Sequence, residues 1–474
     1  MVSKSSRLKM FRDRLCVLLP LAAAGIPPLF IVATVTRYGV NVPFWDQWEF
    51  VKLLDKAAAG QLEFKDFWEQ HNEHRLVLPR VIMLALAKAT QWDIRYEIAA
   101  NVVVAFLVLG MLVLLIERTV RPVAPVIVPW LILAASLTTF SLTQWLNWIW
   151  GWQLQIFMNA LAAVATVWAL ARWRGRWPGL VLALLAAIAG ALSFATGLIL
   201  LALIPLALLI GPRFDQGASR LAHVALTAAI GAGVAALYLN KFRHPGQQPS
   251  PLFLLSHPVS YSYYVLTYMG SGLGAWSTLV SASWGAVGIA AFAWCSTWLW
   301  IRFPDLRHTT LLPWILLGLY GILSGFMIGI GRAGYSAAQA LGPPYVTISS
   351  LFWVSLVVIA SLAITHLLEN RTVFRIQAQA GVAISVSLFT LAGVSYGTSW
   401  IHAEATLKGF HNAIRRGGEC LRDYKKAPDD CLRFLWPEVP TLRERAYRLE
   451  MLQLGPFARR ALGRFPFGVN GPGS

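Results

Sequence analysis

Charged residues are scarce in this chain, and acidic ones are the scarcest. Of its 474 residues 13% are charged, with 22 Asp and Glu against 40 Lys and Arg. Soluble globular proteins carry roughly 25% charged residues, so a soluble fold and a charged disordered chain are both excluded. The formal charge of +18 would suggest nucleic acid on a soluble protein. Basic loops that meet anionic lipid explain it better here, and we expect no nucleic-acid partner.

Cysteine is also rare, because the chain holds only four. That number excludes the disulfide framework of a small secreted scaffold. Cys16 and Cys295 lie in apolar stretches, where cysteine usually acts as a small hydrophobic side chain. Cys420 and Cys431 lie in a polar C-terminal region, and their state depends on which side of a membrane that region occupies.

Apolar residues are abundant and arrive in long blocks. Hydrophobic residues make up 57% of the chain, with 21 Trp and a mean hydropathy of +0.58. A helix needs about 20 apolar residues to cross the hydrocarbon of a bilayer. The sequence therefore predicts an all-α polytopic membrane protein with about 11 transmembrane helices. The expected spans lie near 16–35, 97–116, 123–142, 154–171, 179–193, 195–211, 221–239, 280–300, 311–330, 346–367 and 376–396. The two spans between 179 and 211 also fit one long re-entrant segment.

The connections between these spans alternate between short basic segments and long ones. The short ones are residues 117–122, 172–178, 211–220, 302–308 and 369–375, and each contains arginine. Because basic loops stay in the cytoplasm, the N-terminus, with its basic residues 4–14, is expected there too. The long connections 37–96, 140–153, 240–280 and 331–345 and the tail then lie outside. We expect a transmembrane domain over residues 1–396 and a small helical periplasmic region over 397–474.

The placement of the tail bears on its two cysteines. In an oxidising compartment a disulfide between Cys420 and Cys431 is favoured over two free thiols. Residues 404–416 and 441–452 show the periodicity of amphipathic helices, whereas 465–474 contains Pro and Gly without periodicity.

The first outer loop, residues 37–96, has an unusual density of polar side chains. Asp46 is suited to cap a helix, with Glu49 completing a capping box, and further helices are expected at 64–74 and 77–90. These helices would lie on the membrane surface, anchored by aromatic residues. The polar set comprises Asp46, Glu49, Glu69, His71, Glu73, His74, Arg75 and Arg80. Such a set either forms a site or is merely solvated. Its histidine and glutamate spacing matches no known metal site, so we predict no cofactor, although a divalent metal stays open.

Other outer loops carry aromatic and basic groups. Residues 144–153 combine four Trp with amides, among them Asn147, Trp152 and Gln153. This composition fits an aromatic belt, and it equally fits a sugar site, where rings stack on sugars and amides bond hydroxyls. The 240–280 loop carries Lys241 and Arg243, together with a group of tyrosines. Arg332 stands outside against the charge bias, which is typical of anion binding.

The layout of residues 1–396 resembles the GT-C class of integral-membrane glycosyltransferases. The resemblance rests on the motif Phe44-Trp-Asp-Gln-Trp48 just beyond the first span, the surface helices after it and the later outer arginine. In that class the acid often belongs to an acidic pair, whereas here the nearest acid to Asp46 is Glu49. The resemblance implies a sugar donor linked to polyprenyl phosphate, a cell-envelope acceptor (lipid, glycan or protein) and surrounding membrane lipids as partners.

The same resemblance implies roles for individual residues. Asp46 would be the catalytic base for the acceptor hydroxyl, and a single carboxylate implies direct displacement with inversion. The donor phosphate would be bound by Arg332, Lys241 and Arg243. Substrate would be bound by Trp45, Glu49, His71, Glu73, His74, Arg75, Asn147, Trp152, Gln153 and Tyr345.

Two other functions compete with this interpretation. A polysaccharide polymerase or ligase would use outer-loop Arg and His without an essential carboxylate. A lipid or polysaccharide transporter would show internal repeats and ionisable residues at broken helices, for which residues 193–197 are a candidate. The abundance of Ala, Arg and Trp indicates a bacterial inner membrane.

Overall fold

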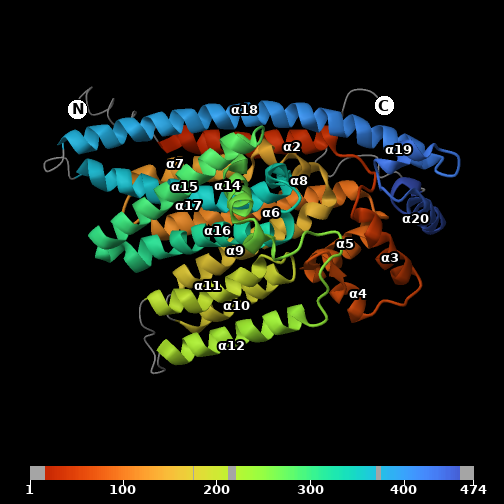
Figure 1. The fold of residues 1–474 in the computed structure, drawn as a ribbon, viewed down its shortest axis with the longest axis horizontal. Coiled ribbons are helices and arrows are strands. Elements are labelled where there is room, and N and C mark those ends of the chain that lie inside the picture. The colour runs from red at the N-terminus through yellow and green to blue at the C-terminus, as the bar shows by residue number, and fades with distance from the viewer. Residues whose placement is uncertain (1–16, 174–175, 212–219, 370–374, 459–474) are drawn as a thin grey trace, which may run out of the picture.

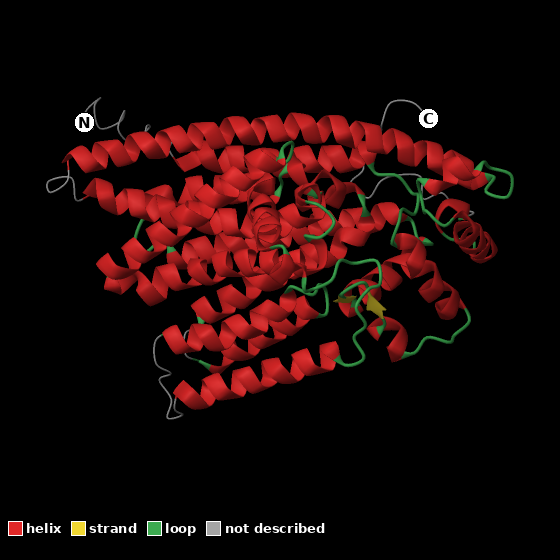
Figure 2. Ribbon diagram, in the orientation of Figure 1, coloured by secondary structure: helices red, strands yellow, loops and turns green. Residues whose placement is uncertain are grey.

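The computed structural model describes residues 17–173, 176–211, 220–369 and 375–458, without the side chains of residues 369, 375–386 and 389. The basic residues 4–14, Cys16, Arg174, Arg213, Arg371 and the segment 465–474 lie outside this part of the chain. The described chain is almost entirely helical (Figure 2). Within it, eight helices are long and apolar enough to cross a membrane. The protein is therefore an all-α polytopic membrane protein.

The eight candidate spans correspond to the predicted ones. They are Val17–Tyr38, which ends in α2 (Ile26–Tyr38); Ile94–Thr119 (α6); Pro125–Ile149, with α7 (Val128–Thr139) and α8 (Trp145–Ile149); Gly151–Arg172, with α9 (Leu154–Arg172); Arg220–Leu239 (α12); Thr278–Arg302 (α15); Pro304–Arg332, with α16 (Leu312–Arg332); and Pro343–Leu368, within α17 (Pro343–Glu369). Single turns connect several helices: η1 (Pro125–Ile127), η2 (Leu142–Gln144), η3 (Gly151–Gln153), η4 (Pro304–Leu306), η5 (Arg307–Leu311), η6 (Ala337–Leu341) and η7 (Gly455–Phe457).

Three of the eleven expected spans do not appear among these eight. Two of them are the shorter apolar helices α10 (Trp177–Ala191) and α11 (Gly197–Ile210). Gly197 touches the backbone of Gly190 so closely that a side chain at that position would collide with it. The segment is thus two short helices that contact each other at the break. The third expected span lies within α18 (Arg375–Arg422).

The connection between the first two spans, predicted as an outer loop, contains more than helices. It forms α3 (Gln47–Ala58), α4 (Phe64–Trp68), the strands β1 (Gln70–His71) and β2 (His74–Arg75), and α5 (Val77–Thr90). The helix expected at 64–74 is wrong in its second half, because it ends at Trp68 and a hairpin follows. The pairing of β1 with β2 places His71 opposite His74. The helix expected at 77–90 is confirmed.

The 240–280 connection is also more ordered than expected. It contains α13 (Phe253–Ser256) and α14 (Pro258–Gly274), and α14 packs closely against α15. A side chain at Gly270 would collide with the backbone of Ser281, so glycine permits this close approach. Tyr261, Tyr264 and Tyr268 of α14 are buried. This half of the connection is therefore a helix whose Tyr-rich face packs into the protein.

The C-terminal region joins the first outer loop. Helix α18 runs along the whole molecule and beyond the other spans, to α19 (Asp429–Arg433) and α20 (Val439–Leu452) (Figure 1). One hydrophobic core contains residues of α2, α3, α6, α18 and α20, and a second lies among the remaining spans. The boundary expected at residue 397 falls inside α18. The helix expected at 404–416 is part of this same helix, and the one expected at 441–452 is α20.

The long connections meet at one end of the bundle, which we call the loop face. It is formed by residues 39–93, 140–153, 240–257 and 331–342 together with the C-terminal region. Hydrogen bonds between these segments, such as those from Gln70 to Arg243 and from Asn147 to Pro343, hold them together. Cys420 and Cys431 form a disulfide in this region, the pairing expected from the sequence, with their Cα atoms 6.2 Å apart.

Candidate functional site

The hairpin β1–β2 carries four of the predicted site residues, His71, Glu73, His74 and Arg75, with Glu73 in its tight turn. Asn72 has a φ of 48°, a left-handed conformation that asparagine tolerates better than most residues. Arg75 anchors the hairpin by donating hydrogen bonds to the carbonyl oxygens of Trp68 (2.8 Å), Asn240 (2.9 Å) and Tyr238 (3.3 Å). The guanidinium of Arg75 is thus buried and occupied by backbone. These bonds fix the hairpin to the end of α12, and the predicted contact of Arg75 with substrate stays a prediction.

Glu73, at the tip of the hairpin, forms the central ion pair of the loop face. Both its carboxylate oxygens accept hydrogen bonds from Nη2 of Arg332 at 2.9 Å. Nε2 of Gln248 donates to Oε2 of Glu73 at 2.5 Å. The contacts join three segments that are far apart in the sequence. Arg332, predicted as a phosphate ligand, is therefore already paired with a carboxylate in this structure.

His74 lies behind this ion pair. Its ring stacks on Phe194 with centroids 4.0 Å apart, and Nδ1 accepts the Ala195 N–H at 3.2 Å. That bond places the ring proton on Nε2, 3.6 Å from Oε1 of Glu73. Burial lowers the pKa of His74 to about 4, even though Glu73 acts to raise it. His74 is thus a neutral donor at neutral pH.

The charge of Glu73 is stabilised by its neighbours. Burial by itself would raise the pKa of Glu73, but His74 and Arg332 and the hydrogen bonds from Gln248 and Arg332 outweigh it and lower the pKa to about 2. Since His74 is neutral at pH 7, Arg332 is the cation that keeps Glu73 ionised there.

Asp46 lies at the start of α3 but does not cap it. Its side chain forms no cap hydrogen bond, so the predicted capping box is wrong. Glu49 instead accepts a hydrogen bond from Arg445 of α20 at 2.8 Å and pairs with Lys52 at 3.0 Å. The Asp46 carboxylate, 27% exposed, has His71 as its ionic neighbour, with 3.5 Å between Oδ2 and Nε2.

Aromatic side chains flank Asp46 and His71. Trp45 is 45% exposed and has a φ of 47°, which is unusual for a large side chain and marks a strained turn before Asp46. The ring of Trp152 contacts His71 edge-on, with centroids 5.1 Å apart. Nε1 of Trp152 and Oε1 of Gln153 are buried without a hydrogen-bond partner in the described part of the chain. Unpaired buried polar atoms are costly, so they mark a place that water or a ligand can occupy.

The amides of the 140–153 segment have a structural use. Nδ2 of Asn147 donates to the carbonyl of Pro343 at 2.9 Å and to the hydroxyl of Thr347 at 2.8 Å. Nε2 of Gln144 donates to the carbonyl of Thr139 at 2.6 Å. Both side chains are completely buried. The bonds of Asn147 hold the segment against α17. Oδ1 of Asn147 is buried without a hydrogen-bond partner in the described part of the chain, and its predicted contact with substrate stays a prediction.

Three further predicted residues lie around the ion pair. The side chain of Gln70 forms two hydrogen bonds with the backbone of Arg243. It donates to the carbonyl oxygen of Arg243 (2.6 Å) and accepts from the N–H of Arg243 (3.0 Å). The side chains of Lys241 and Arg243 are exposed beside the hairpin. Tyr345, at the start of α17, has a ring 6.3 Å from that of Tyr268. Among the described residues no group of three or more His, Cys, Asp and Glu is placed to hold a metal ion.

Two contributors to the site escaped the sequence analysis. Gln248 lies in a polar, proline-containing segment with no motif, and its role follows only from its contact with Glu73. Phe194 lies at the break between α10 and α11, which was considered only as a possible transporter feature. Neither residue carries a sequence signal for this role, because each is brought to the hairpin by a different part of the fold.

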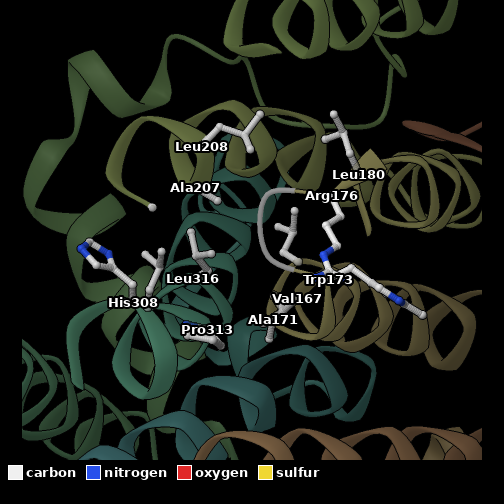
Figure 3. Close-up of a pocket in the computed structure, with 13 residues that line it drawn as sticks. Val167, Ala171, Trp173, Arg176, Leu180, Ala207, Leu208, His308, Pro313 and Leu316 are labelled. Atoms are coloured by element: carbon white, nitrogen blue, oxygen red, sulfur yellow. The ribbon is translucent and has the colours of Figure 1, made fainter. Parts of the chain in front are cut away.

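A separate hollow lies at the opposite end of the bundle, among α9, α10, α11 and α16. Its volume is about 50 Å³, enough for a few water molecules. Apolar side chains line most of it, and Arg176 and His308 lie on opposite sides (Figure 3). Nothing in its lining repeats the chemistry of the loop face.

The class of this protein is defined by its fold and its site, because the comparisons with known proteins found no match. No protein-family model, curated protein or solved structure matches this chain. The observations define a polytopic helical membrane protein with a polar constellation on its loop face, formed by Asp46, His71, Glu73, His74 and Arg332.

Proposed function

We propose that the protein is a GT-C-like membrane glycosyltransferase. It transfers a sugar from a polyprenyl-phosphate donor to a cell-envelope acceptor, which is a lipid, glycan or protein. The loop face would be the periplasmic face of a bacterial inner membrane, since the short basic connections are at the other end.

The observation that carries this proposal is the state of Asp46. A general base must be accessible and within hydrogen-bond reach of the proton it removes. The Asp46 carboxylate makes no cap bond, is partly exposed and lies 3.5 Å from His71. His71 would orient the carboxylate, while Trp45 and Trp152 would flank the sugars, because aromatic faces suit the apolar faces of sugar rings.

Arg332 would bind the leaving phosphate, together with Lys241 and Arg243 near the rim of the site. Cationic donors that face a developing phosphate charge stabilise the transition state. Glu73 holds Arg332 by two hydrogen bonds in the substrate-free structure. An arriving phosphate would compete with Glu73 for this guanidinium, because both are anionic oxygen acceptors.

The expected stereochemical course is inversion. A retaining double displacement needs a second carboxylate that is available as a nucleophile. Glu49 is bound to Arg445 and Lys52, and Glu73 is bound to Arg332 and Gln248. Asp46 is thus the acid best placed to act, and direct displacement by the acceptor hydroxyl follows.

A glycan profile of cells that carry single variants tests the proposal. Asp46→Asn is expected to reduce one specific sugar transfer by about 100-fold or more, with normal membrane levels. The matched control is Asp55→Asn, which removes an acid from the same helix α3 without touching His71. Arg332→Ala is expected to lose the same sugar.

The other outcomes separate the competing functions. Full transfer by Asp46→Asn together with loss by Arg332→Ala would favour a polymerase or ligase that uses Arg and His. If no glycan depends on the protein, glycosyl transfer is wrong and transport is the next assay.

A further inference from the structure

A polar cavity lies on the loop face, apart from the constellation around Asp46. It is enclosed by the last turns of α18, the segment that follows α2, the turn before α6 and the start of η7. Its volume is about 420 Å³, within the range of roughly 300–1,000 Å³ that is typical of small-ligand sites. Its charged lining residues are Asp93, Arg95, Arg415, Glu419 and Arg422.

The charges of the cavity are not balanced internally. Arg95 binds Asp93 through two nitrogens, at 2.9 and 2.6 Å. Arg415 and Arg422, two turns apart on α18, form no ion pair with any residue in the described part of the chain. Glu419 lies between them on the same helix. The lining therefore keeps a net positive charge and two arginines that are available for an anionic group.

The walls of this cavity are held by specific contacts. A side chain at Gly418 would lie 2.6 Å from Cγ2 of Val42, so glycine allows α18 to approach the segment after α2. Asn41 links two other walls, since Nδ2 donates to the carbonyl of Gly455 (3.3 Å) and Oδ1 accepts the Ile94 N–H (3.0 Å). The Cys420–Cys431 disulfide ties the turn that carries Arg422 to α19. These contacts fix the positions of the cavity walls relative to one another.

The cavity lies just beyond the end of the first span. His411 of α18 lies at this end, with its Nδ1 3.1 Å from the carbonyl oxygen of Tyr38. Arg415 and Arg422 follow about 6 and 17 Å further along the helix, at 1.5 Å per residue. The polar headgroup region of a bilayer is about 5–8 Å deep on each side, so Arg422 lies beyond it and a lipid headgroup is a poor ligand for both arginines together.

The cavity is close along the chain to the proposed catalytic residue. Val42 lines it, and Asp46 follows four residues later, a separation of at most about 14 Å along the chain.

We infer that this cavity binds an anionic saccharide, one that carries a carboxylate or phosphate, as part of the acceptor. Arg415 and Arg422 bind the anionic group, and the mixed acidic and polar lining suits hydroxyl groups better than a bare anion. Its role in acceptor binding rests on the proposed function, whereas the binding of the saccharide does not.

Binding to the purified full-length protein in neutral detergent tests this inference. The probes are tetragalacturonate, inorganic phosphate and the neutral maltotetraose, each followed by calorimetry at two salt concentrations. Tetragalacturonate is expected to bind best, and Arg415→Ala and Arg422→Ala are each expected to weaken it by about tenfold. The matched control is Arg416→Ala, which removes the adjacent arginine that does not line the cavity.

Several results would overturn the inference. They are equal weakening in Arg416→Ala, equal binding of maltotetraose or of phosphate alone, and no binding of tetragalacturonate. Competition by phosphatidylglycerol in nanodiscs would assign the site to a lipid headgroup and overturn it as well. Asp46→Asn is expected to bind tetragalacturonate like the wild type. Loss of sugar transfer and loss of acceptor binding are therefore separate failures.

Discussion

Both carboxylate oxygens of Glu73 lie 2.9 Å from Nη2 of Arg332, which joins the tip of the β1–β2 hairpin to the last residue of α16. The two residues are 259 positions apart in the sequence. Their side chains are only 25% and 18% exposed, so neither charge is well solvated without the other. The ion pair thus links the connection between the first two spans to the transmembrane bundle.

The coupling between these two residues is measurable. Glu73→Gln and Arg332→Ala are each expected to destabilise the protein, and the double variant less than their sum, because each single change leaves a poorly solvated group unpaired. We expect a coupling of roughly 1–3 kcal/mol in a double-mutant cycle of unfolding in detergent. The control cycle is Glu117, in the last turn of α6, with Arg121, just after the helix, an exposed pair for which about 0.5 kcal/mol or less is expected. Equal coupling in both cycles would contradict the structural role of the Glu73–Arg332 pair.

The stability of the loop face should fall in two pH windows. The pKa of His74 is lowered from 6.5 to about 4, so the unfolded chain takes up the proton first and stability decreases as the pH falls from 6.5 to 4. The pKa of Glu73 is lowered from 4.5 to about 2, so its contribution is present above pH 4.5 and is lost as the pH falls to 2.

Unfolding free energies measured between pH 8 and pH 3 in detergent check these windows. His74→Gln, which can still accept the Ala195 N–H, is expected to flatten the curve between pH 6.5 and 4. Glu73→Gln is expected to flatten the part below pH 4.5. An unchanged slope in His74→Gln would show that His74 is not buried in the neutral form.

Gly151 leaves room for Glu97, which binds Gln47, the residue next to Asp46. An added Cβ at Gly151 would lie 2.5 Å from Glu97, whose carboxylate accepts hydrogen bonds from Gln47 (2.7 Å) and Trp92 (2.9 Å). Gly151→Ala is expected to cost about 1–3 kcal/mol through overpacking and to reduce sugar transfer, because Gln47 adjoins Asp46. Gly110→Ala is the control, since no atom lies within 4 Å of its added Cβ. Thermal unfolding and the glycan profile measure both effects, and similar behaviour of the two variants would exclude this contact.

The disulfide of the C-terminal region gives a chemical prediction. In the denatured, unreduced protein, a maleimide reagent should label Cys16 and Cys295 but not Cys420 or Cys431. Reduction should expose both and lower the stability of the α18–α20 region by about 2–3 kcal/mol, because the unfolded chain is then less constrained. Labelling of all four cysteines before reduction would show that the pair is not formed.

Much of the helical architecture could be predicted from local sequence. The apolar blocks around residues 97–116 and 346–367 led directly to α6 and α17, because a span is defined by length and composition alone. The end of α4 at Trp68 was missed, since the hairpin that follows is stabilised by Arg75 through carbonyl groups near residue 240. Likewise, α14 is too polar to be recognised as part of the bundle from its sequence. Its place is evident only from the close contact between Gly270 and the backbone of Ser281.

The candidate site divides in the same way. The sequence by itself determined that Asp46, His71, Glu73 and His74 lie in one polar loop beyond the first span, and that Arg332 ends another span. Only the tertiary structure decided that Glu73 binds Arg332, that Arg75 and Asn147 donate to backbone carbonyl groups, and that Glu49 accepts a hydrogen bond from Arg445. Span positions follow from the free energy of placing local segments in hydrocarbon. Side-chain pairing depends on contacts between residues hundreds of positions apart, which local sequence does not encode.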